Sequence, residues 1–161
     1  MTSTGLAWLG FAFVTVFCWG LYGTMLHAGQ VAMGDPVNGR YKAFLFVGLA
    51  YFLVAVLAPL LVLKSQGADW SYPAPGMGLS LVAGILGAVG AFGVLLAFGA
   101  KGSPSVVMAI VFAGAPIVNA FASMIKHPPP GGISSIQWPF VLGILLAALG
   151  GCLVTLYRPQ G

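Results

Sequence analysis

Charged residues are scarce in this sequence. Six lysine and arginine residues and two aspartates are its only charged side chains, and glutamate is missing altogether. They make up 5% of 161 residues, against about a quarter in an average soluble protein. A water-soluble domain of this size cannot cover its surface with so few charges. A hydrophobic content of 60% also excludes a disordered chain. The sequence therefore predicts an integral membrane protein.

The same shortage excludes several kinds of chemistry. Asp35 and Asp69 fall between the apolar runs, so no carboxylate lies at membrane depth and a proton relay of the usual kind is excluded. His27 and His127 are far apart in the chain, which leaves no cluster with the spacing of metal ligands. No serine, histidine and aspartate come together as a nucleophilic triad would need. We expect no metal, no cofactor and no enzymatic activity.

The net charge of +4 does not indicate a nucleic-acid partner, because the basic residues are scattered singly. The two cysteines, Cys18 and Cys152, lie in different apolar runs. We expect both to be small buried apolar residues rather than a redox pair.

The charged residues divide the sequence into five long uncharged runs. A spanning helix needs about 20 residues to cross the hydrocarbon, and each run is long enough. We predict an all-α fold: a polytopic transmembrane bundle of five helices that forms a single membrane domain over residues 1–161. The spans are expected at about residues 5–28, 43–63, 77–100, 104–125 and 137–157. Residues 1–7 contain no lysine or arginine, so the first run is expected to be a retained helix and not a cleaved signal peptide.

Local signals mark the ends of these helices. Ser103 followed by Pro104 predicts an N-cap and a proline at the first helical position. Ser134 and Gln137 have the spacing of a capping box before the fifth helix. Four aromatic residues lie near predicted ends, as membrane-interface anchors do: Trp8, Trp70, Trp138 and Tyr157.

The basic residues also predict an orientation. Five spans place four of them on the face that holds the C-terminus, namely Arg40, Lys42, Lys101 and Arg158. The opposite face has Lys64 and Lys126. Because cytoplasmic loops carry the excess of positive charge, we expect a cytoplasmic C-terminus and an external N-terminus, in a bacterial cytoplasmic (inner) membrane.

Glycine is concentrated in the third run, where four residues recur at intervals of three: Gly84, Gly87, Gly90 and Gly93. Such a series lies along one side of a helix and lets another backbone approach closely. We expect this face to pack against a helix. The fifth run has a weaker version of small residues with Gly143, Ala147, Gly150 and Gly151.

Pro59 and Pro116 lie inside the second and fourth runs and are candidate helix breaks, because each removes a backbone hydrogen bond. Two interpretations remain open. The break exposes carbonyl groups to a cavity, as in transporters, or a nearby hydroxyl or water repairs it.

Few polar residues fall at membrane depth. Trp19 and Tyr22 are three residues apart and so share a helix face. They form either an aromatic wall for a sugar, a nucleobase or an organic cation, or ordinary core packing. Asn119 in the fourth run needs hydrogen-bond partners in hydrocarbon. It either joins two helices or faces a ligand cavity.

Several motifs together resemble a known family. They are Trp19-Gly20, Arg40 at the start of the second helix, AFGAKGSPS at 97–105, APIV at 115–118 and GILLAALG at 143–150. In this order, with a glycine-rich third helix, they resemble one EamA-type five-helix repeat of the drug/metabolite transporter superfamily, and the resemblance covers nearly the whole chain.

Most members of that superfamily are ten-helix chains of two inverted repeats, with the substrate cavity between them. The resemblance therefore implies that this chain is half of such a transporter and pairs with a second five-helix unit. It implies a pocket lined by the first and fourth helices, with Trp19, Tyr22 and Asn119 as substrate-binding residues. Arg40 at the mouth of the second helix would attract an anionic group.

Two functions from different classes remain open. The first is a half-size transporter that moves a small solute, of a kind the residues do not name, as a homo-oligomer or with a related partner. The second is a non-transporting subunit of a larger membrane complex, which packs against partner helices, pigments or lipids. The family usually has a Gly-Glu pair after the fourth helix, whereas this chain has KHPPP at 126–130. That difference favours the second function.

Overall fold

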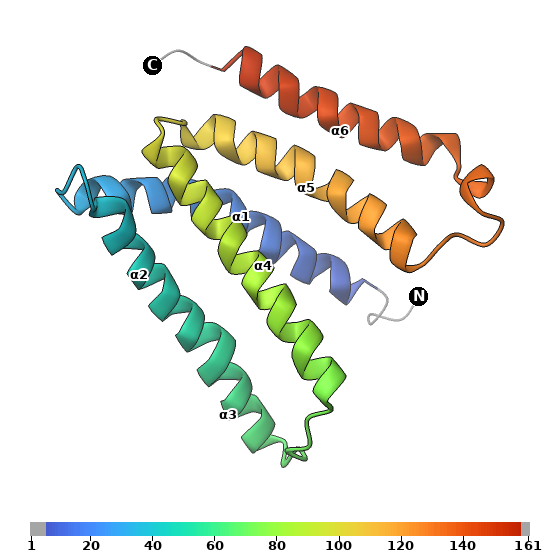
Figure 1. Ribbon diagram of the computed structural model, residues 1–161, viewed down its shortest axis with the longest axis horizontal. Helices are drawn as coiled ribbons and strands as arrows, with labels where there is room; N and C mark the ends of the chain where they lie inside the picture. The colour runs from blue at the N-terminus through green and yellow to red at the C-terminus, as the bar shows by residue number, and fades with distance from the viewer. Residues whose placement is uncertain (1–5, 159–161) are drawn as a thin grey trace. The chain divides into compact units, whose positions relative to one another are not determined.

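The structure, a computed structural model, describes residues 6–158 and consists of helices and loops over that range (Figure 1). Five helical segments are long and apolar enough to cross a membrane: Ala7–Ala32, Gly39–Ser65, Ala74–Gly99, Pro104–Lys126 and Trp138–Leu156. The predicted all-α fold with five helices of membrane-spanning length is confirmed. The predicted start of the first span, residue 5, lies outside the described residues.

The second segment contains three consecutive elements, and a short turn precedes the last helix. The elements are α1 (Ala7–Ala32), α2 (Gly39–Phe52), the π-helix η2 (Leu53–Leu57), α3 (Ala58–Ser65), α4 (Ala74–Gly99), α5 (Pro104–Lys126), the 3-10 helix η3 (Ile133–Ser135) and α6 (Trp138–Leu156).

Two boundaries near the first loop differ from the prediction. Helix α1 continues to Ala32, beyond the predicted end at residue 28, and α2 already begins at Gly39 rather than at 43. The predicted spans end where charge or polarity begins, whereas a helix ends where its backbone is interrupted. Here the interruption comes at Gly34, which has φ +65, and the Asp35-Pro36 turn that follows.

The helix-start signals have different outcomes. Ser103 is the N-cap residue of α5 and Pro104 its first residue, as predicted. The prediction of a capping box before the fifth helix is wrong, because α6 begins at Trp138 with Gln137 as its N-cap residue. Ser134 lies in η3 instead, where its hydroxyl donates to the Gly131 carbonyl at 3.1 Å.

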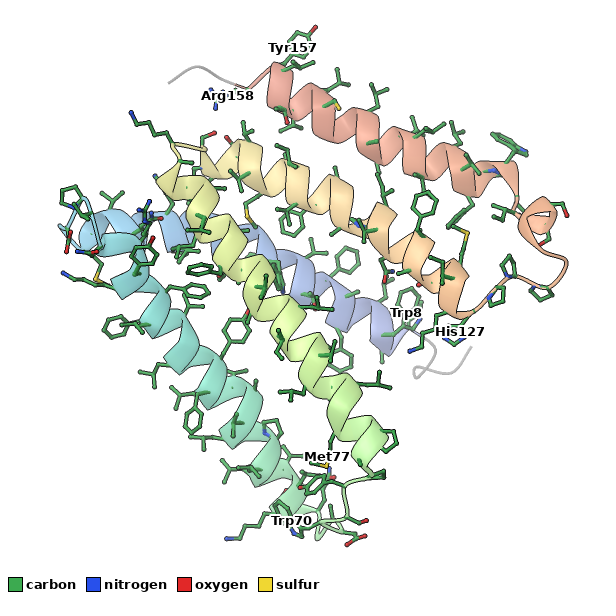
Figure 2. The ribbon with its side chains drawn as sticks, viewed as in Figure 1. Trp8, Trp70, Met77, His127, Tyr157 and Arg158 are labelled. Atoms are coloured by element: carbon green, nitrogen blue, oxygen red, sulfur yellow. The ribbon has the colours of Figure 1, made fainter. Side chains whose placement is uncertain are left out.

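The aromatic anchors lie where the sequence places them, at helix ends. Figure 2 shows Trp8 at the start of α1, Trp70 in the loop after α3 and Tyr157 just beyond α6. Trp138 is the first residue of α6. All four side chains are exposed, as expected for residues that contact the membrane interface.

Most large apolar side chains on the helices are exposed too. Phe11 on α1 is 73% exposed and Leu45 on α2 is 74% exposed. In water this surface would be strongly unfavourable. In a bilayer it contacts lipid tails, which are as apolar as the side chains.

The chain divides by its internal contacts into two compact units, residues 1–101 and 102–161. In the N-terminal unit α1 packs on α2, and both contact α4. The buried side chains of these helices are Leu26, Ala43, Ala91, Val94, Leu95 and Phe98. They lie where α1 ends, α2 begins and α4 ends, so the core of this unit is near one end of its helices.

The C-terminal unit is a hairpin of α5 and α6, which lie side by side (Figure 1). The two helices approach closely at Gly151, where an added Cβ would collide with the Cβ of Ala113. Figure 2 labels Arg158 just beyond the end of α6. Its Nη1 donates to the Ser103 hydroxyl at 3.0 Å, which joins the end of the hairpin to its beginning.

Candidate functional site

A candidate site in the N-terminal unit is a groove between α1 and the α2–η2 segment. Its volume is about 550 Å³. We call it the aromatic groove, and it is lined by Cys18, Trp19, Tyr22, Val47, Ala50, Tyr51, Val54 and Ala55.

Three of the residues that line this groove are aromatic. Trp19 and Tyr22 lie on one face of α1, as their spacing predicts, with ring centroids 5.6 Å apart and planes inclined by 45°. Tyr51 enters from α2, and the sequence analysis missed it. The available signal was its hydroxyl, a polar group in the middle of the second apolar run.

The hydroxyl of Tyr22 is buried and has no hydrogen-bond partner among the described residues. A buried hydroxyl without a partner is unfavourable. A solute or a water molecule in the groove would satisfy it. No charged side chain lines the groove, so its chemistry suits an uncharged, flat or apolar group with a polar edge.

One wall of the groove includes irregular backbone. Val54 and Ala55 belong to the π-helix η2, in which the Ala58 amide donates to the Leu53 carbonyl five residues back. Pro59 follows at once, near the start of α3. Proline has no amide hydrogen, so the carbonyl of Ala55 cannot accept the usual bond from residue 59. The candidate break at Pro59 therefore lies beside the groove.

Pro116 lies elsewhere, inside the continuous helix α5 of the C-terminal unit. Together with Pro139 and Gly143 it lines a smaller apolar groove of about 280 Å³ between α5 and α6.

Asn119 is also on α5, where its side chain is exposed. It does not line the grooves between α5 and α6. Trp19 and Tyr22 belong to the other unit, so a pocket shared by all three residues stays a prediction.

Arg40 does not line the aromatic groove. It lies near the start of α2 and contacts Gly99 at the end of α4, where an added Cβ would collide with the guanidinium group. Its Cζ is 4.9 Å from the centre of the Tyr41 ring. The structure thus separates Arg40 from the aromatic residues with which the resemblance groups it.

The glycines differ in the space around them. For Gly84, Gly87, Gly90 and Gly93 of α4, an added Cβ would meet no neighbouring atom within 4 Å inside the N-terminal unit. Their predicted close packing has no partner there. The close approaches occur instead at Gly39, Gly99 and Gly151.

The cysteines also differ from the expectation. Cys18 and Cys152 are unpaired, and both are exposed rather than buried. Each lines a groove of its own unit, because the helix face that carries it is only partly covered by a neighbour.

The loop between α1 and α2 is organised by Asp35. Its Oδ1 accepts hydrogen bonds from the amides of Val37 at 3.0 Å and Asn38 at 2.8 Å, and its Oδ2 pairs with Lys42 Nζ at 2.7 Å. The Asn38 amide bond first, and then the Lys42 side chain, lower the pKa of Asp35 from 3.8 to about 2.

This lowered pKa predicts a pH-dependent turn. Because the pKa is lower in the folded state, Asp35 contributes to the stability of that state. This contribution is fully present above pH 3.8 and is lost as the pH falls through about 2. The variant Asp35→Asn should have a lower melting temperature than the parent at pH 5. At pH 2 the two melting temperatures should be nearly equal. Thermal unfolding in detergent across this range measures it. An equal gap at both pH values would contradict the assignment.

Comparisons of the chain with protein-family models, with curated proteins and with solved structures find no match.

Proposed function

We propose that the chain is a half-size membrane transporter of drug/metabolite type, a single EamA-like five-helix repeat that moves a small solute after pairing with a second five-helix unit. The observation that carries this proposal is the aromatic groove. A groove of about 550 Å³ with three aromatic side chains and an unpartnered hydroxyl is of a size and composition suited to a small solute.

The groove is open on one side, and the N-terminal unit that forms it does not enclose it. A second five-helix unit, either another copy or a related chain, would complete the cavity. Transport would then be facilitative, or coupled to an ion held by carbonyl groups near Pro59, because the described spans contain no carboxylate. The expected location is a bacterial cytoplasmic (inner) membrane with the C-terminus inside.

The experiment is uptake into vesicles that contain the purified protein, with labelled sugars, nucleobases and organic cations as separate probes. In Trp19→Ala, the loss of a stacking surface should reduce the uptake of the best probe about tenfold or more. Trp70→Ala, in the loop after α3, is the matched control and should transport normally. Unchanged uptake in both Trp19→Ala and Asn119→Ala would refute the site assignment.

A second candidate function, a non-transporting subunit of a larger complex, is favoured by the open glycine face of α4. Gly84, Gly87, Gly90 and Gly93 leave room for a partner helix, pigment or lipid. The native mass after gentle extraction discriminates the two functions. A species of twice 16.5 kDa supports the transporter. A larger particle with other polypeptides or pigments supports the subunit.

A further inference from the structure

A group of unsatisfied polar atoms lies at the end of the N-terminal unit that holds the α1–α2 loop. Three polar atoms there are buried without a hydrogen-bond partner in the described chain: Nδ1 of His27, Oε1 of Gln30 and Nε of Arg40. Buried polar atoms without partners are rare in native proteins, and each one requires an explanation. A bound polar group or a water molecule would satisfy such atoms.

A cavity is present at this place. Gln30 and Arg40 line a pocket of about 330 Å³ together with Val31, Gly34, Asp35 and Pro36, which we call the polar pocket. A water molecule occupies about 30 Å³ of liquid, so the pocket has room for a small polar group. It shares no lining residue with the aromatic groove.

The charges of the polar pocket are unbalanced. Asp35, its acidic residue, already accepts two backbone hydrogen bonds and pairs with Lys42. Arg40 has no ion pair and no hydrogen bond within the described part of the chain. One guanidinium charge is therefore left over beside a cavity, and an anion would compensate it.

The local packing keeps the guanidinium group in place. Gly99 allows Arg40 to lie against the last turn of α4, because a Cβ at that position would collide with it. Gly39 brings the start of α2 against α1, where its added Cβ would be only 2.9 Å from the Gln30 carbonyl oxygen. Two glycines thus hold Arg40 and Gln30 on the walls of one pocket.

The geometry points to a phosphate-binding site in the polar pocket, in which Arg40 supplies the charge and Gln30 a neutral hydrogen bond. The planar guanidinium group matches phosphate oxygens in a bidentate manner. The Gln30 amide can turn to present its NH₂ group, since its oxygen and nitrogen have nearly the same shape. The pocket lies where two spans end and one begins, at the expected depth of lipid phosphates. A lipid headgroup and a soluble phosphate compound share this chemistry.

The test measures binding in two arms. In the first, the protein in phosphatidylcholine nanodiscs is titrated with inorganic phosphate at constant ionic strength. In the second, the protein in mild detergent receives equal amounts of phosphatidylglycerol and phosphatidylcholine, and native mass spectrometry counts the retained lipids. Neither arm measures transport, so its result is independent of the proposed function.

Two variants and one control decide the result. Arg40→Gln removes the charge, and Gln30→Glu places an internal carboxylate beside Arg40 that competes with the ligand without leaving a cavity. Each should weaken binding about tenfold or more. Lys64→Gln is the matched control, an equal change of charge at an exposed position in the last turn of α3, and should bind as the parent does.

Each outcome has a defined meaning. Phosphate binding in the first arm identifies a soluble ligand, and selective retention of phosphatidylglycerol in the second identifies a lipid headgroup; both support the site. If Arg40→Gln fails to fold, Gln30→Glu decides. The proposal is overturned if neither arm detects binding, or if the folded variants bind as well as Lys64→Gln does.

Discussion

Gly151→Ala should destabilise the α5–α6 hairpin by about 1–3 kcal/mol, the usual cost of an added methyl group in a closely packed contact. The new Cβ would collide with the Cβ of Ala113 on the facing helix. The two helices would have to separate, and the Arg158–Ser103 hydrogen bond at the end of the hairpin would be strained with them. Unfolding of the full chain in detergent, followed by circular dichroism, measures the loss.

The same helix provides the control. Gly143→Ala adds an identical methyl group where no neighbouring atom lies within 4 Å, and it should stabilise the helix by about 0.5–1 kcal/mol. The double variant Ala113→Gly, Gly151→Ala moves the methyl group from one helix to the other and should recover most of the loss. If Gly151→Ala proves as stable as Gly143→Ala, the close approach is not present in solution.

Gly39→Ala should be about as damaging, by roughly 1–3 kcal/mol, for a different reason. Its Cβ would lie 2.9 Å from the carbonyl oxygen of Gln30 and 3.3 Å from the Cβ of Met33. A backbone carbonyl cannot rotate away as a flexible side chain can. The start of α2 would therefore move away from α1, and the Asp35 turn between them would be distorted. Thermal unfolding measures the loss.

Gly48→Ala on the same helix meets no neighbour within 4 Å and should raise stability slightly. Gly39→Ala should also weaken phosphate binding at the polar pocket, which Gly48→Ala should leave unchanged. An increase of stability in both variants would contradict the close contact between α1 and α2.

The sequence predicts the helices well because the bilayer imposes a simple constraint. Long uncharged runs must be helical to satisfy their backbone in hydrocarbon, so five helices could be placed from charge alone. Trp19 and Tyr22 could be paired for a similar reason, since a spacing of three places both on one helix face. Both inferences depend only on local geometry.

The remaining features depend on which helix faces meet. Tyr51 joins the groove because of the register between α1 and α2, and nothing in its own segment specifies that register. The spacing of Gly84, Gly87, Gly90 and Gly93 is more regular. The close contacts within their unit are nevertheless made by Gly39 and Gly99. A glycine matters for packing where another group approaches it, and the helix crossing determines that place. That Arg40 is left without an ion pair in the described part of the chain was likewise not predictable, because only the folded unit shows Asp35 already paired with Lys42.

The two exposed cysteines allow a distance between the two units to be measured by spectroscopy. The sequence contains only Cys18 and Cys152, and each of the two compact units carries one of them unpaired. Nitroxide labels on the native thiols would report the distance between the units by pulsed electron resonance, with no engineered sites. The same measurement with and without an added solute, or in detergent and in a bilayer, would show whether the two units of this protein move relative to each other.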